Sequence, residues 1–363
     1  TVGLPFNSGS VIAGVVLIAI ILYALKYTRQ KQYVHLNTGV LCLTFIIIGF
    51  STWLMLPIRA NANVVINENN PSSARELLAY YNLEQYPETH LFYGPQFTDQ
   101  YAYLDENNPY LDEKPNYERD EKTGKYIITN NFKNAKQNTD DNHKAFLPRM
   151  WSSDNAVNYM TFTEPLDFRI KSEYADEHEL IDIVAQFRSA FNSGRLDLED
   201  YDSFLKSYGE YLIIEKPSFI NNMKFMFQFQ FGYMYWRYLM WNFVGRQSDI
   251  QWKGDQIDGN WISGIPIVDE IRLGSQKKLP SQVLENKGRN KYYFLPLILG
   301  IIGLLFQIKW DKENFFTLFL FFLFTGAAII FYTNPKPFEP RERDYAVVGS
   351  FYIFAIWVGF GVL

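Results

Sequence analysis

Polar and apolar residues are separated along this chain over tens of residues. Residues 1–58 contain no Asp or Glu, residues 59–291 are charged and rich in asparagine, and residues 292–363 are again mostly apolar. Soluble domains mix the two kinds of residue within each helical turn. This separation is therefore typical of a protein that crosses a membrane.

Five uncharged apolar runs are candidates for membrane-spanning helices. The hydrocarbon core needs about 17–25 apolar residues in helical form, whereas a buried core helix needs only about 10–14. In lipid, only helices and closed barrels satisfy their backbone hydrogen bonds. The runs are Val11–Leu25 preceded by Ser8–Ser10, Thr38–Ile58, Tyr292–Ile308, Asn314–Thr333 and Ala346–Leu363.

These runs predict a mainly α fold: a polytopic membrane helical bundle with a large mixed α/β extracytoplasmic domain inserted between crossings. Residues 1–58 would form two transmembrane helices, residues 59–291 the inserted domain, and residues 292–363 three further transmembrane helices. The lipid bilayer is then a partner of the chain. Cys42, which lies inside the second run, is expected to be a small packing residue.

The charge of the short loops predicts the side on which the inserted domain lies. Lys26–His35 carries three basic and no acidic residues, and positive short loops stay in the cytoplasm. The long segment is then outside the cytoplasm, although Lys287, Arg289 and Lys291 beside the third crossing depart from this rule. The chain carries a net charge of −5, with its acidic excess in residues 59–291, so no nucleic-acid partner is expected.

Local patterns predict several elements within the long segment. Pro71 indicates a helix from that residue to about Glu84. Residues 116–131 predict a β-hairpin that turns near Thr123–Gly124. Apolar residues at helical spacing predict the helices His178–Asn192, which Gly194 would end, and Leu198–Ile213.

Residues 217–245 form an unusual aromatic stretch. Aromatic side chains occupy every second position from Phe225 to Tyr235, which favours a strand, whereas the length and the initial Pro217 favour a helix. We predict a helix at the membrane surface, because Tyr and Trp prefer the headgroup region and Arg237 can extend its charge to it. The alternative is an ordinary aromatic core element of the outer domain.

Three polar clusters lie where apolar runs meet the long segment. The first is residues 57–71, whose side chains can hydrogen-bond sugar hydroxyls or can simply form turns and helix caps. We consider five of them candidates for a sugar or acceptor cleft: Arg59, Asn61, Asn63, Asn67 and Glu68.

The second cluster is residues 339–350, at the start of the fifth run. Arg341 and Arg343 are predicted to bind the phosphate of a lipid donor, because a guanidinium fork makes two parallel bonds to phosphate oxygens. Asp344 and Tyr345 would belong to the neighbouring sugar or acceptor cleft. The alternative is interfacial anchoring of the helix, since charges at a membrane edge are costly unless paired or functional.

The third cluster is residues 236–247, where charged and polar side chains lie among aromatic rings. Aromatic faces stack on sugar rings and on arginine, but they also form interfacial belts in membrane proteins. Its candidates for the same cleft are Trp236, Arg237, Trp241, Asn242 and Arg246.

The sequence contains no evident cofactor or metal motif. The four histidines (His35, His90, His143 and His178) lack the spacing of zinc ligands and are expected at the surface. No cofactor is predicted, and a divalent metal has no support in this sequence.

Long motifs of this chain resemble a family of large bacterial multispanning proteins. They include PIRANANVVINENNP, HLFYGPQF, LPRMWSS, YMYWRYLMWNFVGRQ, DGNWISGIP and EPRERDYAVVGSFYIFAIWVG. The family is protein O-mannosyltransferase-like and belongs to the GT-C glycosyltransferase superfamily, and related animal membrane proteins O-mannosylate folded extracellular domains. The resemblance runs from about Pro57 to the end of the chain.

The resemblance implies a membrane glycosyltransferase that moves a sugar, expected to be mannose, from a polyprenyl phosphate donor to Ser or Thr of exported proteins. It would lie in the bacterial inner membrane with its large domain in the periplasm. In GT-C enzymes the base is usually an acidic residue of the first outer loop, which would precede Thr1. The chain therefore resembles an internal fragment, with the family's C-terminal part also missing, and we assign no catalytic residue.

Two interpretations from other classes remain. A non-catalytic membrane scaffold would present the outer domain to cell-envelope or secretion partners. A lipid or solute transporter would favour polar residues and broken helices at mid-membrane, and the uncharged runs count against it.

Overall fold

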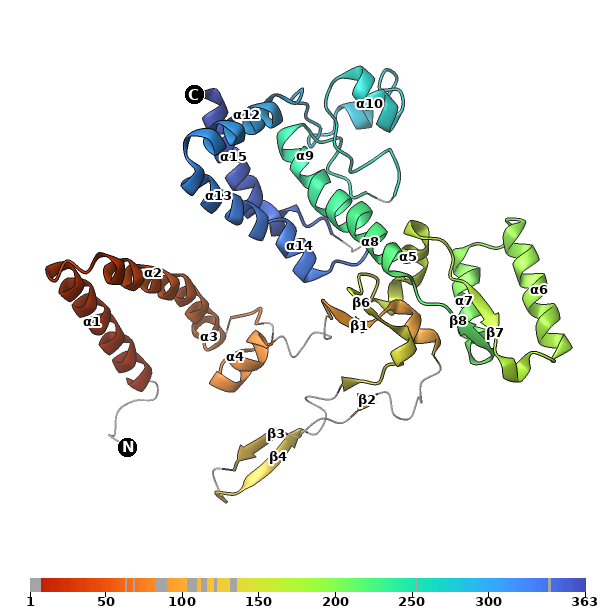
Figure 1. Cartoon of the computed structure of the whole chain (residues 1–363), viewed down its shortest axis with the longest axis horizontal. Helices are drawn as coiled ribbons and strands as arrows, with labels where there is room; N and C mark the ends of the chain where they lie inside the picture. Colours follow the sequence, from red (N-terminus) through yellow and green to blue (C-terminus); the bar gives the residue numbers. More distant parts are fainter. Residues whose placement is uncertain are drawn as a thin grey trace. The chain divides into compact units, whose positions relative to one another are not determined.

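A computed structural model shows a mainly helical chain, with 62% helix and 7% strand. It describes residues 8–62, 64–67, 69–82, 90–102, 110–111, 116–120, 123–130, 136–252, 254–338 and 341–363. The chain divides into two compact units, which we call the N-terminal unit (residues 1–88) and the C-terminal unit (residues 89–363) (Figure 1). The predicted mainly α class is confirmed.

The N-terminal unit consists of apolar helices followed by one short polar helix. Its elements are α1 (Ser8–Gln30), α2 (Val34–Ser51), a 3₁₀ turn (Thr52–Leu54), α3 (Met55–Ala60) and α4 (Ala74–Tyr81). Helices α1 and α2 pack as a hairpin, tied by a 2.8 Å hydrogen bond from the Asn37 amide to the Thr28 hydroxyl. Cys42 is exposed on α2, so its predicted packing role is wrong.

Helix α4 begins later than predicted, because its N-cap is a serine rather than the residue before Pro71. The Ser73 hydroxyl accepts the backbone N–H of Glu76, and the Glu76 carboxylate accepts the backbone N–H of Ser73 at 2.9 Å. This reciprocal capping box fixes the start at Ala74. The predicted end, at about Glu84, lies outside the described residues.

In the described part of the C-terminal unit, strands occur as small antiparallel pairs. They are β1 (Tyr93–Pro95) with β6 (Lys144–Phe146), β2 (Tyr110–Leu111) with β5 (Lys136–Gln137), β3 (Asn116–Arg119) with β4 (Tyr126–Asn130), and β7 (Phe168–Ile170) with β8 (Leu212–Ile214). The β3–β4 pair confirms the predicted hairpin. Gly124 supplies the positive φ (66°) that its turn requires.

The C-terminal unit also contains further short helices. They are α5 (Ala156–Phe162), α6 (His178–Asn192), α7 (Leu198–Tyr208), α10 (Pro266–Leu273) and α11 (Ser281–Leu284), with 3₁₀ turns at Phe97–Tyr101, Asp141–His143, Ser153–Asn155, Ser172–Tyr174, Gly209–Tyr211 and Asp344–Val347.

The bounds of α6 are those predicted. The second predicted helix ends at Tyr208 rather than Ile213, because Leu212–Ile214 forms the strand β8 and pairs with β7.

Residues 219–243 form one continuous helix, which we call the aromatic helix. It consists of α8 (Phe219–Phe225), a π-helical stretch (Met226–Trp236) and α9 (Arg237–Phe243). The helix interpretation is confirmed and the strand interpretation is wrong. Phe225, Phe229 and Tyr238 are fully buried, whereas Phe227 and Trp236 are exposed, so the aromatic residues cover both the buried and the exposed sides of one helix.

Four apolar helices complete the C-terminal unit: α12 (Leu295–Trp310), α13 (Lys312–Phe324), α14 (Ala327–Thr333) and α15 (Val348–Val362). Among the described residues, four helical segments are long and apolar enough to cross a membrane: Val11–Gln30, Val34–Ala60, Lys312–Thr333 and Asp344–Val362. Five were predicted. Helix α12 is too short for this criterion, because Tyr293 and Phe294 have positive φ values (54° and 61°) and delay its start.

One hydrophobic core runs through the C-terminal unit. It extends from β7, α6 and α7, through the aromatic helix, to α15. Helices α12 and α15 approach most closely where they carry glycine: a Cβ atom on Gly303 would lie 1.8 Å from the Trp357 carbonyl oxygen, and one on Gly361 would lie 2.0 Å from the Leu299 carbonyl oxygen. Small residues of this kind let helix backbones meet.

Candidate functional site

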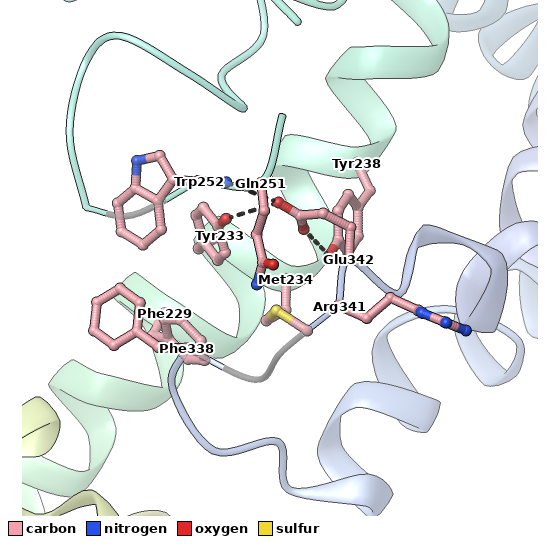
Figure 2. A pocket seen from close by; sticks show the side chains of 9 residues that line it. All are labelled: Phe229, Tyr233, Met234, Tyr238, Gln251, Trp252, Phe338, Arg341 and Glu342. Carbon is pink, nitrogen blue, oxygen red and sulfur yellow. Dashed lines mark hydrogen bonds between the residues drawn. The ribbon is translucent and has the colours of Figure 1, made fainter. Parts of the chain in front are cut away.

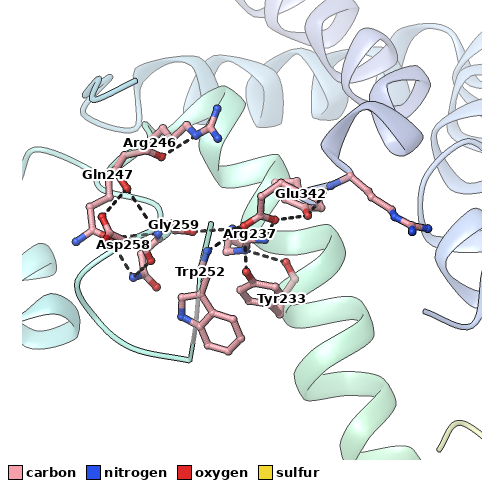
Figure 3. A network of polar contacts seen from close by, with 12 residues as sticks. Tyr233, Arg237, Arg246, Gln247, Trp252, Asp258, Gly259 and Glu342 are labelled. Atoms are coloured by element: carbon pink, nitrogen blue, oxygen red, sulfur yellow. Dashed lines mark hydrogen bonds and ion pairs between the residues drawn. The ribbon is translucent and has the colours of Figure 1, made fainter. Parts of the chain in front are cut away.

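A buried ion pair joins the aromatic helix to the segment before α15. The Arg237 guanidinium donates to the two Glu342 carboxylate oxygens, at 3.2 Å and 2.6 Å, and its side chain is only 5% exposed. It also donates to the Gly259 carbonyl at 2.6 Å and the Tyr233 carbonyl at 3.2 Å. Figure 3 shows this guanidinium between the helix and the loop that carries Gly259.

Glu342 is the acceptor at the centre of this network. It also accepts hydrogen bonds from the hydroxyls of Tyr233 (3.3 Å) and Tyr238 (2.6 Å) and from the backbone N–H of Trp252 (3.2 Å). Burial by itself raises the pKa of Glu342, but Arg237 and the hydrogen bonds of its other donors outweigh burial, so this pKa lies below its usual value. Burial raises the pKa of both tyrosines. The Glu342 carboxylate is therefore ionised, and these donors use its hydrogen-bonding capacity.

A small recess opens beside this ion pair (Figure 2). It encloses only about 10 Å³, and its lining residues are Phe229, Tyr233, Met234, Tyr238, Gln251, Trp252, Phe338, Arg341 and Glu342. The rings of Tyr233 and Trp252 lie 4.0 Å apart, and those of Trp252 and Phe338 are stacked at 5.7 Å. The recess thus combines an aromatic wall with an arginine at its rim.

Arg341 and Arg343, the predicted phosphate-binding pair, are both exposed and flank the partly buried Glu342. Figure 2 shows the Arg341 side chain extending away from Glu342. The backbone N–H of Arg343 donates to the Tyr238 hydroxyl at 3.0 Å, which fixes the segment on the aromatic helix.

The remaining candidates near residues 236–247 have different environments. Arg246 stacks on the Trp241 ring at 4.0 Å and donates to the Ser248 carbonyl at 2.9 Å. Trp241 is buried and Trp236 is 49% exposed. Asn242 is exposed and donates to the Tyr238 carbonyl at 2.8 Å. Of residues 236–247, Arg237 and Tyr238 hydrogen-bond to the second cluster, through Glu342 and Arg343.

Asp344 is partly buried and Tyr345 is 59% exposed, both in the 3₁₀ turn that leads into α15. They follow Arg343 directly. Neither of them lines the recess, so the structure places the two residues at the base of α15 rather than beside the aromatic wall.

The first polar cluster belongs to the N-terminal unit. The Asn61 amide donates to the carbonyls of Pro57 and Ser72, each at 2.8 Å, and the Asn67 amide donates to the Ala60 carbonyl at 3.2 Å and to Asn70. These asparagines therefore organise the turn after α3. Arg59 is exposed, and the candidates Asn63 and Glu68 lie outside the described residues.

The sequence prediction missed a second buried polar network, centred on Arg149. This side chain is 0% exposed and donates to the carbonyls of Phe331 (2.9 Å) and Leu91 (3.0 Å). Among the residues that the structure describes, no carboxylate pairs with it, and burial lowers its pKa to about 10. It lies instead at the C-terminal end of α14, where unpaired carbonyls favour a cation.

Amide side chains extend this network. Asn222 accepts the Arg149 backbone N–H at 2.8 Å and donates to Gln96 at 2.8 Å. Asn334 donates to the Pro148 carbonyl at 2.9 Å and accepts from Gln230 at 2.8 Å. The one signal in the sequence was the motif LPRMWSS around Arg149, which suggested no role without the tertiary contacts.

His143 is a further correction. It was expected at the surface, but it is 8% exposed and its ring lies 3.0 Å from the Thr98 hydroxyl. Burial lowers its pKa below the usual value. Within the described ranges, no group of three or more His, Cys, Asp or Glu residues could hold a metal ion.

Comparison with known proteins gives one partial match. The model of a family of unknown function (DUF8416) matches residues 87–227. No curated protein and no solved structure matches the chain. The matched segment contains Arg149 and Asn222 but ends before Gln230 and Asn334, so it includes part of the second polar network and none of the ion pair or the recess.

Proposed function

We propose that this chain is part of a membrane glycosyltransferase that transfers a sugar, mannose by family resemblance, from a polyprenyl phosphate donor to Ser or Thr of exported proteins. The supporting observation is the position of Arg341 and Arg343. Both are exposed immediately before Asp344–Val362, a helix long and apolar enough to cross a membrane. A lipid phosphate would lie at this depth, since the headgroup region adjoins the end of a span.

The aromatic recess supports the same proposal. It lies beside Arg341 and its wall includes Trp252 and Phe338. Aromatic faces are suited to stacking on a sugar ring, while the guanidinium is suited to phosphate oxygens. A sugar phosphate presents both groups next to each other, so one donor could contact the arginine and the wall together.

The proposed reaction is an inverting transfer. A base removes the proton of the acceptor hydroxyl, whose oxygen attacks the anomeric carbon of the sugar as the bond from that carbon to the polyprenyl phosphate oxygen breaks. Arg341 and Arg343 would stabilise the negative charge that develops on the departing phosphate. Glu342 is unsuited to the role of base, because Arg237, Tyr233 and Tyr238 already occupy it.

The test is the double variant Arg341→Ala/Arg343→Ala in the protein as the cell makes it. Loss of a group that stabilises developing charge costs about 100-fold or more in rate, so we expect the sugar on secreted proteins to fall below detection by mass spectrometry. The control is Arg169→Ala/Arg195→Ala, which removes two exposed arginines of the same unit. Normal glycosylation by an inserted double variant of Arg341 and Arg343 would contradict the assignment.

The occupied state of Glu342 favours one alternative, a non-catalytic scaffold for cell-envelope or secretion partners. A carboxylate that accepts five hydrogen bonds stabilises the fold and is not free to take part in a reaction. The scaffold predicts unchanged glycans after deletion of the gene and loss of a complex that co-purifies with the protein. The same mass spectrometry experiment, run on the deletion strain, separates the two functions.

A further inference from the structure

An exposed aromatic surface lies at the β1–β6 strand pair and the start of the aromatic helix. We call it the aromatic edge and define it as Phe92, Tyr93, Phe146, Phe219 and Ile220, each of which is at least half exposed. Tyr93 pairs with Phe146 across the two strands, and Phe146 stacks on Phe219 at 6.3 Å. Large exposed apolar groups gathered in this way mark an interaction surface.

Four hydrogen bonds hold the chain next to this edge against the end of α14. Arg149 bridges the Leu91 carbonyl and the Phe331 carbonyl, Trp151 donates to the Asn334 carbonyl at 2.9 Å, and Asn334 donates to the Pro148 carbonyl at 2.9 Å. The ring of Phe92 also lies 6.3 Å from that of Phe331. The edge therefore has a fixed position relative to the last turn of α14.

The length of the α13–α14 segment gives the depth of that turn. Lys312–Thr333 contains 22 residues and would be about 33 Å long as one straight helix at 1.5 Å per residue. Thr325 and Gly326 separate α13 from α14, so this length is an upper bound, and the hydrocarbon core is about 30 Å thick. If Lys312 lies at one boundary of the bilayer, then Phe331 lies at the other. Side chains fixed to Phe331 are consequently at the level of the lipid headgroups.

We propose that the aromatic edge inserts into the headgroup layer of the bilayer and so docks this part of the C-terminal unit on the membrane surface. Aromatic side chains prefer this layer, and buried apolar groups on surface elements reach about 5–10 Å into it. Lys224, exposed on the last turn of α8, adds a positive charge that favours anionic headgroups. The proposal rests on α13–α14 crossing the bilayer and does not depend on sugar transfer.

Site-specific fluorescence quenching tests this proposal in vesicles. In a Cys42→Ser background, Ile220→Cys or Phe146→Cys carries an environment-sensitive dye, and the vesicles contain phosphatidylcholine with a nitroxide at the headgroup or high on the acyl chain. Insertion at this depth predicts at least about twofold stronger quenching of these labels than of a water-exposed one. The matched control is Ile181→Cys, an exposed isoleucine on the charged helix α6.

Two further measurements separate the explanations. A dye on the native Cys42, within the apolar segment Val34–Ala60, should be quenched by a nitroxide deep in the acyl chain and reports membrane insertion by itself. Equal quenching at Ile220→Cys and Ile181→Cys would overturn the proposal, as would access of a water-soluble quencher to both at the same rate. Glycosylation is not measured, so the outcome is independent of the proposed enzyme activity.

Discussion

The two sets of apolar helices have similar compositions but pack in different ways. In the N-terminal unit, most side chains of α1 and α2 are exposed, and a Cβ atom on Gly39 would meet nothing within 4 Å. In the C-terminal unit, a Cβ atom on Gly303 would lie 1.8 Å from the Trp357 backbone, and Trp357 itself is fully buried. Hydropathy identifies both sets as suited to lipid, but it does not tell a loosely packed pair from a tightly packed bundle.

The difference lies in which residues face a neighbour. Gly300, Gly303 and Gly361 occur where α12 and α15 meet, so their missing side chains bring the backbones together. The Trp357 indole then donates to Gln307 at 2.7 Å inside the apolar contact. In membranes such contacts replace the hydrophobic effect as the source of helix association. The α1–α2 pair has exposed faces that lipid or further helices would cover.

The largest effect expected is that of breaking the Arg237–Glu342 ion pair of the C-terminal unit. Glu342→Ala leaves Arg237 buried without its carboxylate, and removing one partner of a buried pair costs about 3–5 kcal/mol of unfolding free energy. Thermal unfolding in detergent should fall accordingly, and hydrogen exchange should accelerate across the aromatic helix but not in α1–α2. The control is Glu313→Ala, at an exposed position on α13. Equal stability of the two variants would show that packing alone holds the unit.

A smaller effect, opposite in sign between the two regions, is expected for glycine substitutions. Gly303→Ala forces α12 and α15 apart, and overpacking costs about 1–3 kcal/mol. Gly39→Ala fills open space on α2 and should stabilise that helix by about 0.5–1 kcal/mol, because alanine loses less backbone entropy than glycine. Amide hydrogen exchange measures the stability of each helix pair separately. The comparison fails if both substitutions shift exchange in the same direction.

The smallest effect expected is a pH dependence confined to the C-terminal unit. Burial holds the pKa of His143 below its ordinary value of 6.5, so the unfolded chain binds a proton more readily than the folded one. This contribution to stability is present above about pH 6.5 and is lost as the pH falls through the lower, folded-state pKa. The free energy of unfolding should therefore decrease as the pH is lowered from about 7.5 to about 5.

His143→Gln should flatten that slope while keeping a polar group beside Thr98. Exchange in α1–α2, followed in the same samples, serves as the internal control. An unchanged slope in His143→Gln would assign the dependence to another group.

Patterns of local sequence predicted most of the helical content. The helix His178–Asn192 and the hairpin around Gly124 follow from spacing and turn residues, which act within a few positions of the chain. The predictions failed where residues distant in the sequence determine the secondary structure. Leu212–Ile214, for example, is a strand because it pairs with β7. Among the site residues, Arg341 and Arg343 were singled out, but Glu342 between them was not, because its role exists only through contacts with residues about a hundred positions away.

The sequence by itself determined that this chain has long uncharged helices and a polar segment between them, because length and lack of charge suffice to make a helix compatible with lipid. Only the tertiary structure decided which arginines are used in the interior and which remain at the surface. Arg149 and Arg237 are buried by carbonyls, a carboxylate and aromatic rings, whereas Arg341 is exposed. The charge of a residue follows from the sequence, but its burial and its partners depend on segments that come together only when the chain folds.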